Sequence, residues 1–137
     1  TFQDFLDLQV ENIVVEDEFS FSFDQELMKK IWEEIEQKVE GVYVTSSGHD
    51  NIEVMALGAD KGTAVKTLAN HLGFSIDEVA VIGDNLNDVP MFKVAGMAIA
   101  MGNGHEDAKA AAHQVTKTNN ENGVGYAIRQ LADGSWT

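Results

Sequence analysis

Three polar residues, Asp84, Asn87 and Asp88, follow a short apolar run at a spacing that could hold a metal ion beside a phosphate. The run, residues 79–83, is rich in β-branched side chains, which is typical of a buried strand of a parallel sheet. Ligands of open α/β sheets bind beyond the carboxyl ends of the strands, so we expect Asp84 to lie in that crevice. Asn87 and Asp88 come three and four positions later and would face back toward it from the start of a helix. Because Mg²⁺ takes one or two carboxylates with waters and phosphate oxygens, the cluster predicts a magnesium site.

The same residues have a simpler interpretation as a strand, a turn and a helix N-terminus. Asn and Asp favour such turns because their side chains cap backbone N–H groups. The segments on either side of the cluster favour the chemical interpretation. Residues 58–65 (Gly-Ala-Asp-Lys-Gly-Thr-Ala-Val) precede it, and residues 98–105 and then 115–124 follow it.

In this order and at this spacing, the motifs resemble the second half of a Cof-type phosphatase of the haloacid dehalogenase (HAD) superfamily. The resemblance covers nearly the whole chain and is most specific over residues 58–131. It implies that Lys61 binds the transferring phosphoryl group, that Asp84 ligates Mg²⁺, that Asn87 contacts phosphate and that Asp88 holds the water shell of the metal. A lysine at a helix start opposes the helix dipole, unless it meets an anion there together with the helix N-terminus. An exposed helix lysine is the alternative for Lys61.

The family's nucleophile lies in a D-x-D-G-T segment after the first strand, and no such segment is recognisable here. The early aspartates Asp4, Asp7 and Asp17 follow no apolar strand and form no D-x-D. The resemblance therefore transfers Lys61 and the cluster of residues 84–88 but no nucleophile. We expect this chain to be a C-terminal fragment of a longer enzyme, without activity by itself.

The composition narrows the class of protein. The chain has 137 residues, of which 44% are hydrophobic, and a net charge of −14, which argues against nucleic-acid binding. No stretch approaches the roughly 20 apolar residues of a membrane span, and no signal peptide is visible. Cysteine is absent, which excludes disulfides and thiolate metal sites and suits a cytoplasmic location. The four histidines show no close metal-ligand spacing, and no nucleotide-binding glycine motif occurs.

The part of the chain before residue 58 predicts a mixed α+β unit. A short strand is expected over residues 11–16, and Phe residues alternate with Ser over residues 19–23. Apolar residues then recur every four positions over residues 24–39, which predicts a helix with Asp24 as N-cap. Residues 42–47 and 51–55 have the composition of a hairpin. Residues 1–57 would be the C-terminal part of the family's substrate-selecting cap.

The part from residue 58 predicts alternating helices and strands. Such alternation implies an α/β fold with a doubly wound parallel sheet, here the C-terminal part of the HAD-like core over residues 58–137. We expect helices over residues 61–72, 87–94, 105–112 and 124–131, and strands over residues 79–82, 97–100 and 114–116.

The expected function is Mg²⁺-dependent hydrolysis of small phosphorylated metabolites by the intact protein, through the aspartyl-phosphate intermediate that the resemblance implies. The alternative is a non-catalytic module that binds a ligand or dimerises, which the absent D-x-D favours. Without the first strand of the core, the predicted strand 79–82 would have an open edge, through which we expect the fragment to self-associate. We expect no nucleic-acid or membrane partner.

Overall fold

The structure, a computed structural model, describes residues 25–48 and 51–136. Helix α2 (Gln25–Lys38) leads into strand β1 (Val42–Thr45), which pairs antiparallel with β2 (Glu53–Ala56). A positive φ of 78° at Gly41 turns the chain between helix and strand, as glycine allows at low cost. Ile35, Val39 and Val44 are buried together where the helix lies against the hairpin. The predicted helix and hairpin are confirmed.

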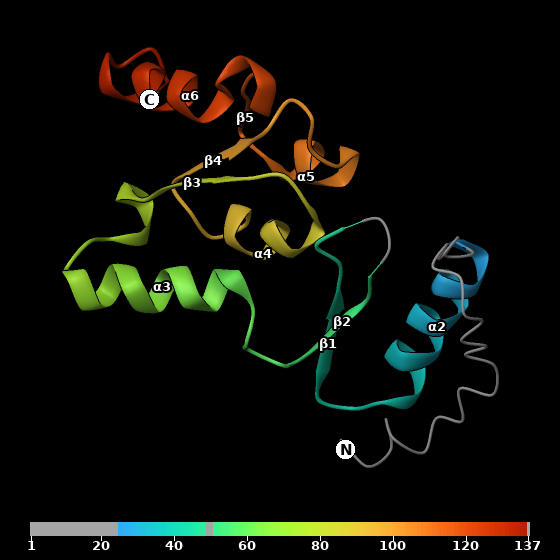
Figure 1. Cartoon of the computed structure of the whole chain (residues 1–137). Helices are drawn as coiled ribbons and strands as arrows, with labels where there is room; N and C mark the ends of the chain where they lie inside the picture. Colours follow the sequence, from blue (N-terminus) through green and yellow to red (C-terminus); the bar gives the residue numbers. More distant parts are fainter. Residues whose placement is uncertain (1–24, 49–50, 137) are drawn as a thin grey trace, which may run out of the picture.

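A parallel sheet forms the second part of the chain, in the strand order β3-β4-β5. Its strands are β3 (Ala80–Gly83), β4 (Met97–Ala100) and the short β5 (Gln114–Val115). Figure 1 shows α3 (Lys61–Leu72) and α4 (Val89–Phe92) on one side of this sheet and α6 (Gly123–Ala132) on the other. Helix α5 (Glu106–Ala111) connects β4 to β5. The predicted α/β architecture is therefore confirmed.

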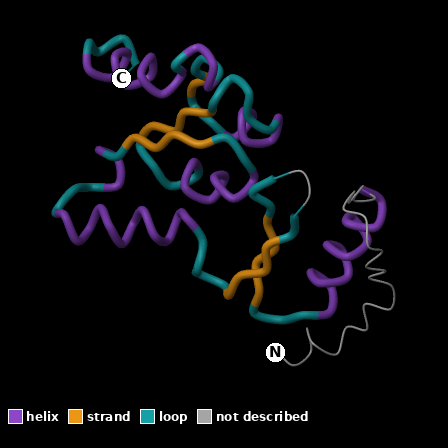
Figure 2. The backbone as a smooth tube through the Cα atoms, in the orientation of Figure 1, coloured by secondary structure: helices purple, strands orange, loops and turns teal. Residues whose placement is uncertain are grey.

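Short 3₁₀ turns stand between several of these elements (Figure 2). They are η1 (Ile76–Glu78), η2 (Leu86–Asp88) and η3 (Asn119–Glu121). The main apolar core lies between β3, β4 and the helices on one face. Its buried side chains are Val81, Met91, Phe92, Ala95, Ala98, Ala100 and Ala108.

Two predicted elements, helix 61–72 and strand 97–100, have the predicted bounds, and most others shift by a residue or two. The prediction of one helix over residues 87–94 is wrong in form: the chain makes the turn η2 and then the single-turn helix α4. The cause is local, because the Asp88 carboxylate accepts hydrogen bonds from backbone N–H groups before it and tightens residues 85–88 into a 3₁₀ turn. The predicted strand 11–16, the Phe alternation at 19–23 and the N-cap Asp24 lie outside the described residues.

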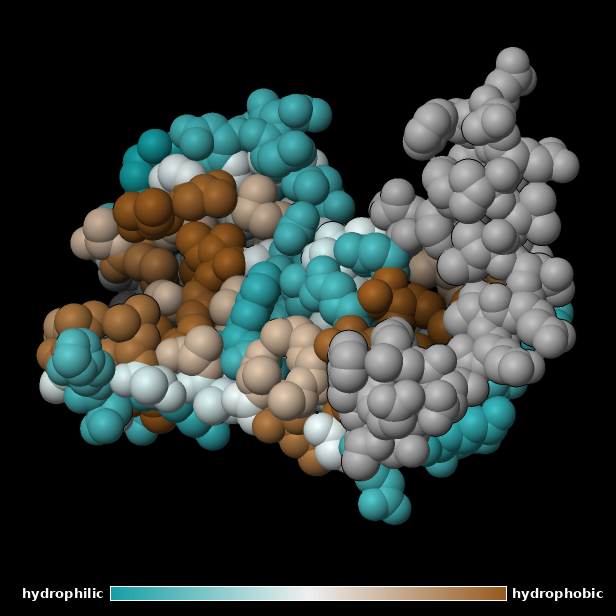
Figure 3. Space-filling view, turned by 60° about the horizontal axis from the view of Figure 1, so that its bottom comes forward, coloured by the Kyte–Doolittle hydropathy of each residue, from teal (hydrophilic) through white to brown (hydrophobic). Residues whose placement is uncertain are grey.

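One edge of the parallel sheet is open within the described residues, where β3 pairs only with β4. Beside it, α3 and the turn that follows expose large apolar side chains, namely Leu68 (57%), Leu72 (58%) and Phe74 (57%). The space-filling view shows apolar surface gathered on the side of the molecule away from the grey residues (Figure 3). None of the helices in the described part of the chain is long and apolar enough to cross a membrane.

Candidate functional site

Lys61 is the first residue of α3, and two neighbours fix it there. Asp60 is the N-cap, with its carboxylate accepting from the backbone N–H of Thr63 at 2.9 Å. That hydrogen bond, more than any other contact, holds the pKa of Asp60 below its ordinary value. Gly62 lies against the backbone of Pro90, since an added Cβ would come within 2.5 Å of the Pro90 carbonyl oxygen. Only a residue without a side chain lets α3 approach α4 so closely, so the Lys-Gly pair in the motif has a packing reason.

Asp84 follows the end of β3 and is exposed, as the strand-end argument predicts. Both polar groups of its backbone are hydrogen-bonded. The N–H donates to Asp88 Oδ2 at 2.7 Å, and the carbonyl accepts from the N–H of His105 at 2.7 Å. The loop after β4 thus borders the loop after β3, with Gly104 packed against the Asp84 backbone. Asp84 is therefore an exposed carboxylate on a well-anchored backbone.

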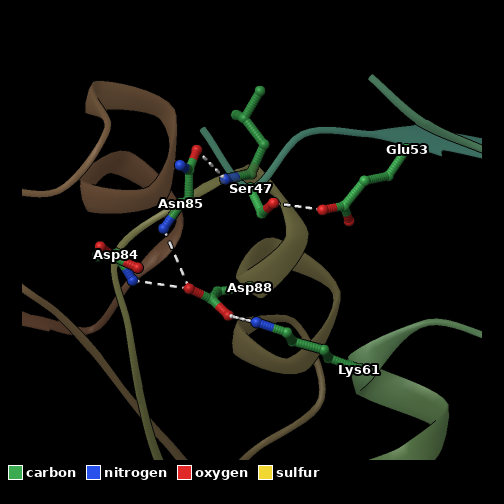
Figure 4. A network of polar contacts seen from close by, with 7 residues as sticks. Ser47, Glu53, Lys61, Asp84, Asn85 and Asp88 are labelled. Atoms are coloured by element: carbon green, nitrogen blue, oxygen red, sulfur yellow. Dashed lines mark hydrogen bonds and ion pairs between the residues drawn. The ribbon is translucent and has the colours of Figure 1, made fainter. Parts of the chain in front are cut away.

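Asp88 lies at the centre of the site and is almost fully buried, with 3% of its surface exposed. Its Oδ2 accepts from the backbone N–H groups of Asp84 at 2.7 Å and Asn85 at 3.1 Å, and its Oδ1 lies 2.5 Å from Lys61 Nζ (Figure 4). Asn85 caps the same turn, accepting from the N–H of Leu86 at 2.8 Å. The buried charge is paired and hydrogen-bonded, which is the condition under which a carboxylate can be buried.

Gly83 makes room for this carboxylate. A Cβ at Gly83 would lie 2.5 Å from both Cγ and Oδ2 of Asp88, closer than any real contact. The glycine between the apolar strand and Asp84 is thus required by the Asp88 side chain that folds back over it.

Asn87 is half-buried, and its backbone N–H donates to the carbonyl of Ser46 at 3.2 Å, at the end of the hairpin. Among the described residues, no hydrogen bond joins the side chains of Asn87 or Asp84 to those of Lys61 and Asp88. The structure therefore brings Lys61 and Asp88 together directly, places the backbone of Asp84 against them, and leaves the side chains of Asp84 and Asn87 outside the pair.

The donor chemistry of the site fits Mg²⁺, which prefers hard oxygen ligands and usually keeps several waters. Asp84 offers an exposed carboxylate, and Asp88 Oδ1 has a lone pair beyond the one that Lys61 uses. No cluster of three or more His, Cys, Asp or Glu side chains that could hold a metal occurs within residues 25–48 and 51–136. A magnesium ion here would take Asp84 directly, and waters and phosphate oxygens would complete its shell.

A cleft of about 650 Å³ opens beside the site, between α2, the hairpin, η2 and α5. Its lining includes Trp32, Glu36, Ser46, Asn51, Leu86 and His105. Because Leu86 and His105 flank Asp84 in the structure, the cleft gives a ligand access to the Asp84 loop from the hairpin side.

Three contributors to this geometry were not predicted from the sequence: Asn85, Ser46 and the close approach of Gly62. Asn85 and Asp88 have the spacing of a capping box, which could have identified the turn. Ser46 acts through its backbone carbonyl, for which a sequence carries no signal. Residues 102–104 form a turn whose N–H groups at Gly102 and Gly104 donate to the carbonyls of Lys117 and Met101.

Comparison with known proteins supplies a family for this geometry. The model of a family described as haloacid dehalogenase-like hydrolase matches residues 2–128. The 5-amino-6-(5-phospho-D-ribitylamino)uracil phosphatase YcsE of Bacillus subtilis is 40% identical over an alignment of 122 residues that covers 87% of this chain and 49% of that protein. Phosphatase YwpJ of the same organism is 40% identical over 111 residues, covering 81% of this chain and 39% of YwpJ. The chain thus spans about half the length, or less, of these relatives.

Solved structures agree in fold. A haloacid dehalogenase-like hydrolase from B. subtilis superposes with a TM-score of 0.75 at 38% identity, over 86% of this chain and 44% of that one. A HAD subclass IIB sugar phosphatase superposes with a TM-score of 0.72 at 27% identity, over 76% of this chain and 40% of that one. The resemblance stated from the sequence motifs is confirmed.

Proposed function

Because this chain belongs to the haloacid dehalogenase-like hydrolases, we propose that it forms the phosphate- and metal-binding half of a Mg²⁺-dependent phosphatase. One observation carries the proposal. At the end of β3, a half-exposed ammonium from α3 is held by a buried carboxylate that also binds the backbone of Asp84, a residue whose own carboxylate is exposed. A cation and a free carboxylate at one strand end suit an anionic phosphoryl group bound together with a divalent metal.

Each residue has a distinct part in this proposal. Asp84 would hold the metal, which when bound supplies positive charge to the phosphoryl oxygens. Lys61 binds a phosphoryl oxygen and neutralises charge on it during in-line transfer, with the N-terminus of α3 acting on the same anion. Asp88 holds the Lys61 ammonium and the Asp84 backbone in position and would hold the water shell of a bound metal. Asn87 contributes a hydrogen bond to a phosphate oxygen.

The nucleophile in this proposal is the aspartate of the family's D-x-D-G-T segment, which this sequence lacks. In the covalent route, a carboxylate oxygen attacks phosphorus as the bond to the leaving oxygen breaks, and water then releases phosphate. The chain would therefore contribute charge and position, and a first half of the enzyme would contribute the attacking group.

The substrate in this proposal is a small phosphorylated metabolite with a hydroxyl-rich leaving group. Two relatives bear the names of a ribitylaminouracil phosphatase and a sugar phosphatase, and both names describe phosphate esters of polyols or sugars. The cleft beside the Asp84 loop would take the leaving group, with residues 1–57 as part of the cap and residues 58–137 as part of the core. The rival function, a non-catalytic module that binds or dimerises, draws support from the lack of a D-x-D.

A chimera tests the proposal. The first half of phosphatase YwpJ, joined before this chain, should restore Mg²⁺-dependent hydrolysis of para-nitrophenyl phosphate, whereas the chain alone should hydrolyse none. In the chimera, Lys61→Ala and Asp84→Ala should each lower kcat about a hundredfold or more, because both act on charge in the transition state. Asn87→Ala should lower it by about tenfold, since one neutral hydrogen bond is lost.

Lys66→Ala is the matched control, because Lys66 is an exposed lysine on the same helix. Its kcat should stay within about twofold of the unsubstituted chimera, as for an ordinary surface substitution. Near-normal kcat in Lys61→Ala or Asp84→Ala would show that the site is assigned wrongly. Mg²⁺-dependent turnover by the chain alone, lost on Asp84→Ala, would overturn the requirement for a first half.

A further inference from the structure

The side chain of Asn51 makes several of the hydrogen bonds that hold the end of the β1–β2 hairpin, together with the hydroxyl groups of Ser46 and Ser47. Its Oδ1 accepts from the backbone N–H groups of Ser47 at 3.2 Å and Gly48 at 3.1 Å, and it lies 2.9 Å from Ser46 Oγ. Its Nδ2 donates to Ser47 Oγ at 2.8 Å. Three consecutive residues are therefore hydrogen-bonded to one amide, and Ser46 Oγ adds a second link by accepting from the N–H of Gly48 at 3.2 Å.

The turn held by Asn51 is the one that contacts the phosphate site. The carbonyl of Ser46 accepts the backbone N–H of Asn87 at 3.2 Å, and Ser46 is 94% buried, with 6% exposed. This hydrogen bond joins the hairpin to η2. Asn87, which donates it, is the residue before Asp88, and Asp88 pairs with Lys61. The path from Asn51 to Asn87 thus consists of two consecutive sets of hydrogen bonds.

We propose that Asn51 is a positioning residue for the phosphate site. Its side-chain oxygen fixes residues 46–48, the Ser46 carbonyl of that turn holds the Asn87 backbone, and the direction of the Asn87 amide is set as a result. The inference rests on the proposed function in one respect, namely that the Asn87 amide binds phosphate. The connection from Asn51 to Asn87 is argued from the hydrogen bonds alone.

Two substitutions distinguish the contribution of the Asn51 side-chain oxygen from that of the rest of its side chain. Asn51→Ala removes every hydrogen bond of the side chain. Asn51→Asp keeps an oxygen acceptor for the N–H groups of residues 47 and 48, loses the Nδ2 donor to Ser47 and Glu53, and adds a negative charge. Asn120→Ala is the matched control, because Asn120 is an exposed loop asparagine whose side chain makes none of these contacts.

Amide hydrogen exchange of the whole chain, followed by NMR, tests the connection. In Asn51→Ala, exchange at Asn87 should rise by about tenfold or more, as expected when a supporting hydrogen bond is lost. Exchange at Asn87 should stay within about threefold of the unsubstituted chain in Asn51→Asp and Asn120→Ala. The amides of β4 should not change, since β4 lies in a different sheet from the hairpin.

Three results would overturn the inference. One is unchanged exchange at Asn87 in Asn51→Ala. Another is an equal rise of the exchange rate at Asn87 in Asn51→Ala and Asn51→Asp, which would show that the side-chain oxygen of Asn51 is not what positions Asn87. The last is an equal rise at Asn87 and at the paired hairpin residues Val44 and Val54, which would make Asn51 a residue of hairpin stability only.

The function is judged separately, with inorganic phosphate and Mg²⁺ as the probe and the Asn87 side-chain amide as the reporter. Phosphate should shift this signal in the unsubstituted chain, and its Kd should rise about fivefold or more in Asn51→Ala, the effect of one misplaced hydrogen bond. Absence of any shift in the unsubstituted chain would count against the proposed function and would leave the exchange result as the test of positioning. A shift with the same Kd in Asn51→Ala would overturn the positioning role.

Discussion

Lys61 and Asp88 are 27 positions apart in the sequence, and their charged groups lie 2.5 Å apart in the structure. The two side chains differ in environment: 48% of the Lys61 side chain is exposed, against 4% of the Asp88 side chain. The Asp88 carboxylate is thus buried, whereas about half of the Lys61 side chain is in contact with solvent. This asymmetry leaves Lys61 able to meet an anion while it neutralises a buried charge.

A double-mutant cycle should measure this pair. Asp88→Asn should lower the free energy of unfolding by about 1–3 kcal/mol, because one donor to a buried carboxylate loses its partner. Lys61→Met should cost about 1 kcal/mol, since half of the lysine side chain is in water. Urea unfolding of the single and double variants gives the coupling energy, which should be about 1 kcal/mol.

The exposed pair of Lys38 and Glu34, 3.2 Å apart on α2, is the control for that cycle. Its coupling energy should be about 0.3–0.5 kcal/mol, typical of neighbours one turn apart on a helix surface. Equal coupling energies for the two pairs would contradict the special position of Lys61 and Asp88.

Gly83→Ala should displace the Asp88 carboxylate. The new methyl group would lie 2.5 Å from Asp88 Cγ, so the side chain or the strand must move, at a cost of about 1–3 kcal/mol in unfolding free energy. The hydrogen bond from the Asp84 N–H should be lost with it, and the amide signal of Asp84 should shift in an NMR spectrum.

Gly41→Ala provides a contrast for Gly83→Ala. It strains a backbone with φ of 78° but meets no atom within 4 Å of the added Cβ. It should cost about 1 kcal/mol without moving the Asp84 signal. A Gly83→Ala chain as stable as the wild type, with an unchanged Asp84 signal, would show that the close approach is unimportant.

The N-cap of α3 should make stability depend on pH. The pKa of Asp60 is lowered, chiefly by the N–H of Thr63, so its charged form is the one that the folded chain favours. The stability that this cap contributes is therefore present above the ordinary pKa of 3.8 and is lost as the pH falls through the lowered folded-state value. Asp60→Ala should cost about 0.5–2 kcal/mol at pH 7.

Thermal unfolding of Asp60→Asn isolates the charge, because asparagine keeps an oxygen that can cap the helix. The difference in Tm between wild type and Asp60→Asn should be largest near neutral pH and should shrink below about pH 4. A difference that stays constant across this range would show that the charge of Asp60 contributes nothing.

The open edge of β3 should make the chain associate. The carbonyls of Val79 and Gly83 point to β4, so the alternate residues Ala80 and Ile82 direct their backbone groups away from it. An unpaired strand edge beside exposed apolar side chains recruits another strand. Light scattering after size exclusion should therefore give a mass above that of one 14.9 kDa chain at micromolar concentration.

Ala80→Pro should reduce this association, because proline removes an outward N–H at the first residue of an edge strand, where it is tolerated. Leu68→Ser combined with Leu72→Ser tests the apolar contribution on α3. A monomeric wild-type chain at high concentration would contradict the prediction, as would an oligomer that neither variant weakens.

The sequence by itself determined the elements and the chemistry of the strand ends. The bounds of α3 and β4 follow from local signals, namely an N-cap at Asp60, a left-handed Gly73 and a short run of apolar residues. Asp84 could be placed at the end of β3 because a parallel sheet puts the residue after each strand in one crevice. The type of residue and its distance from the strand were sufficient for that inference.

The tertiary structure decided what the side chains do there. The turn η2 replaces a predicted helix because the Asp88 carboxylate folds back onto the N–H groups of Asp84 and Asn85 and is neutralised by a lysine from another helix. The approach of Gly62 to Pro90 and the bond from Asn87 to Ser46 likewise join segments that are distant in the chain. The spacing of Asn85 and Asp88 is a local signal for the turn itself. The contacts to Lys61, Pro90 and Ser46 arise instead from packing between elements and from backbone groups that every residue carries, so no local pattern in the sequence could specify them.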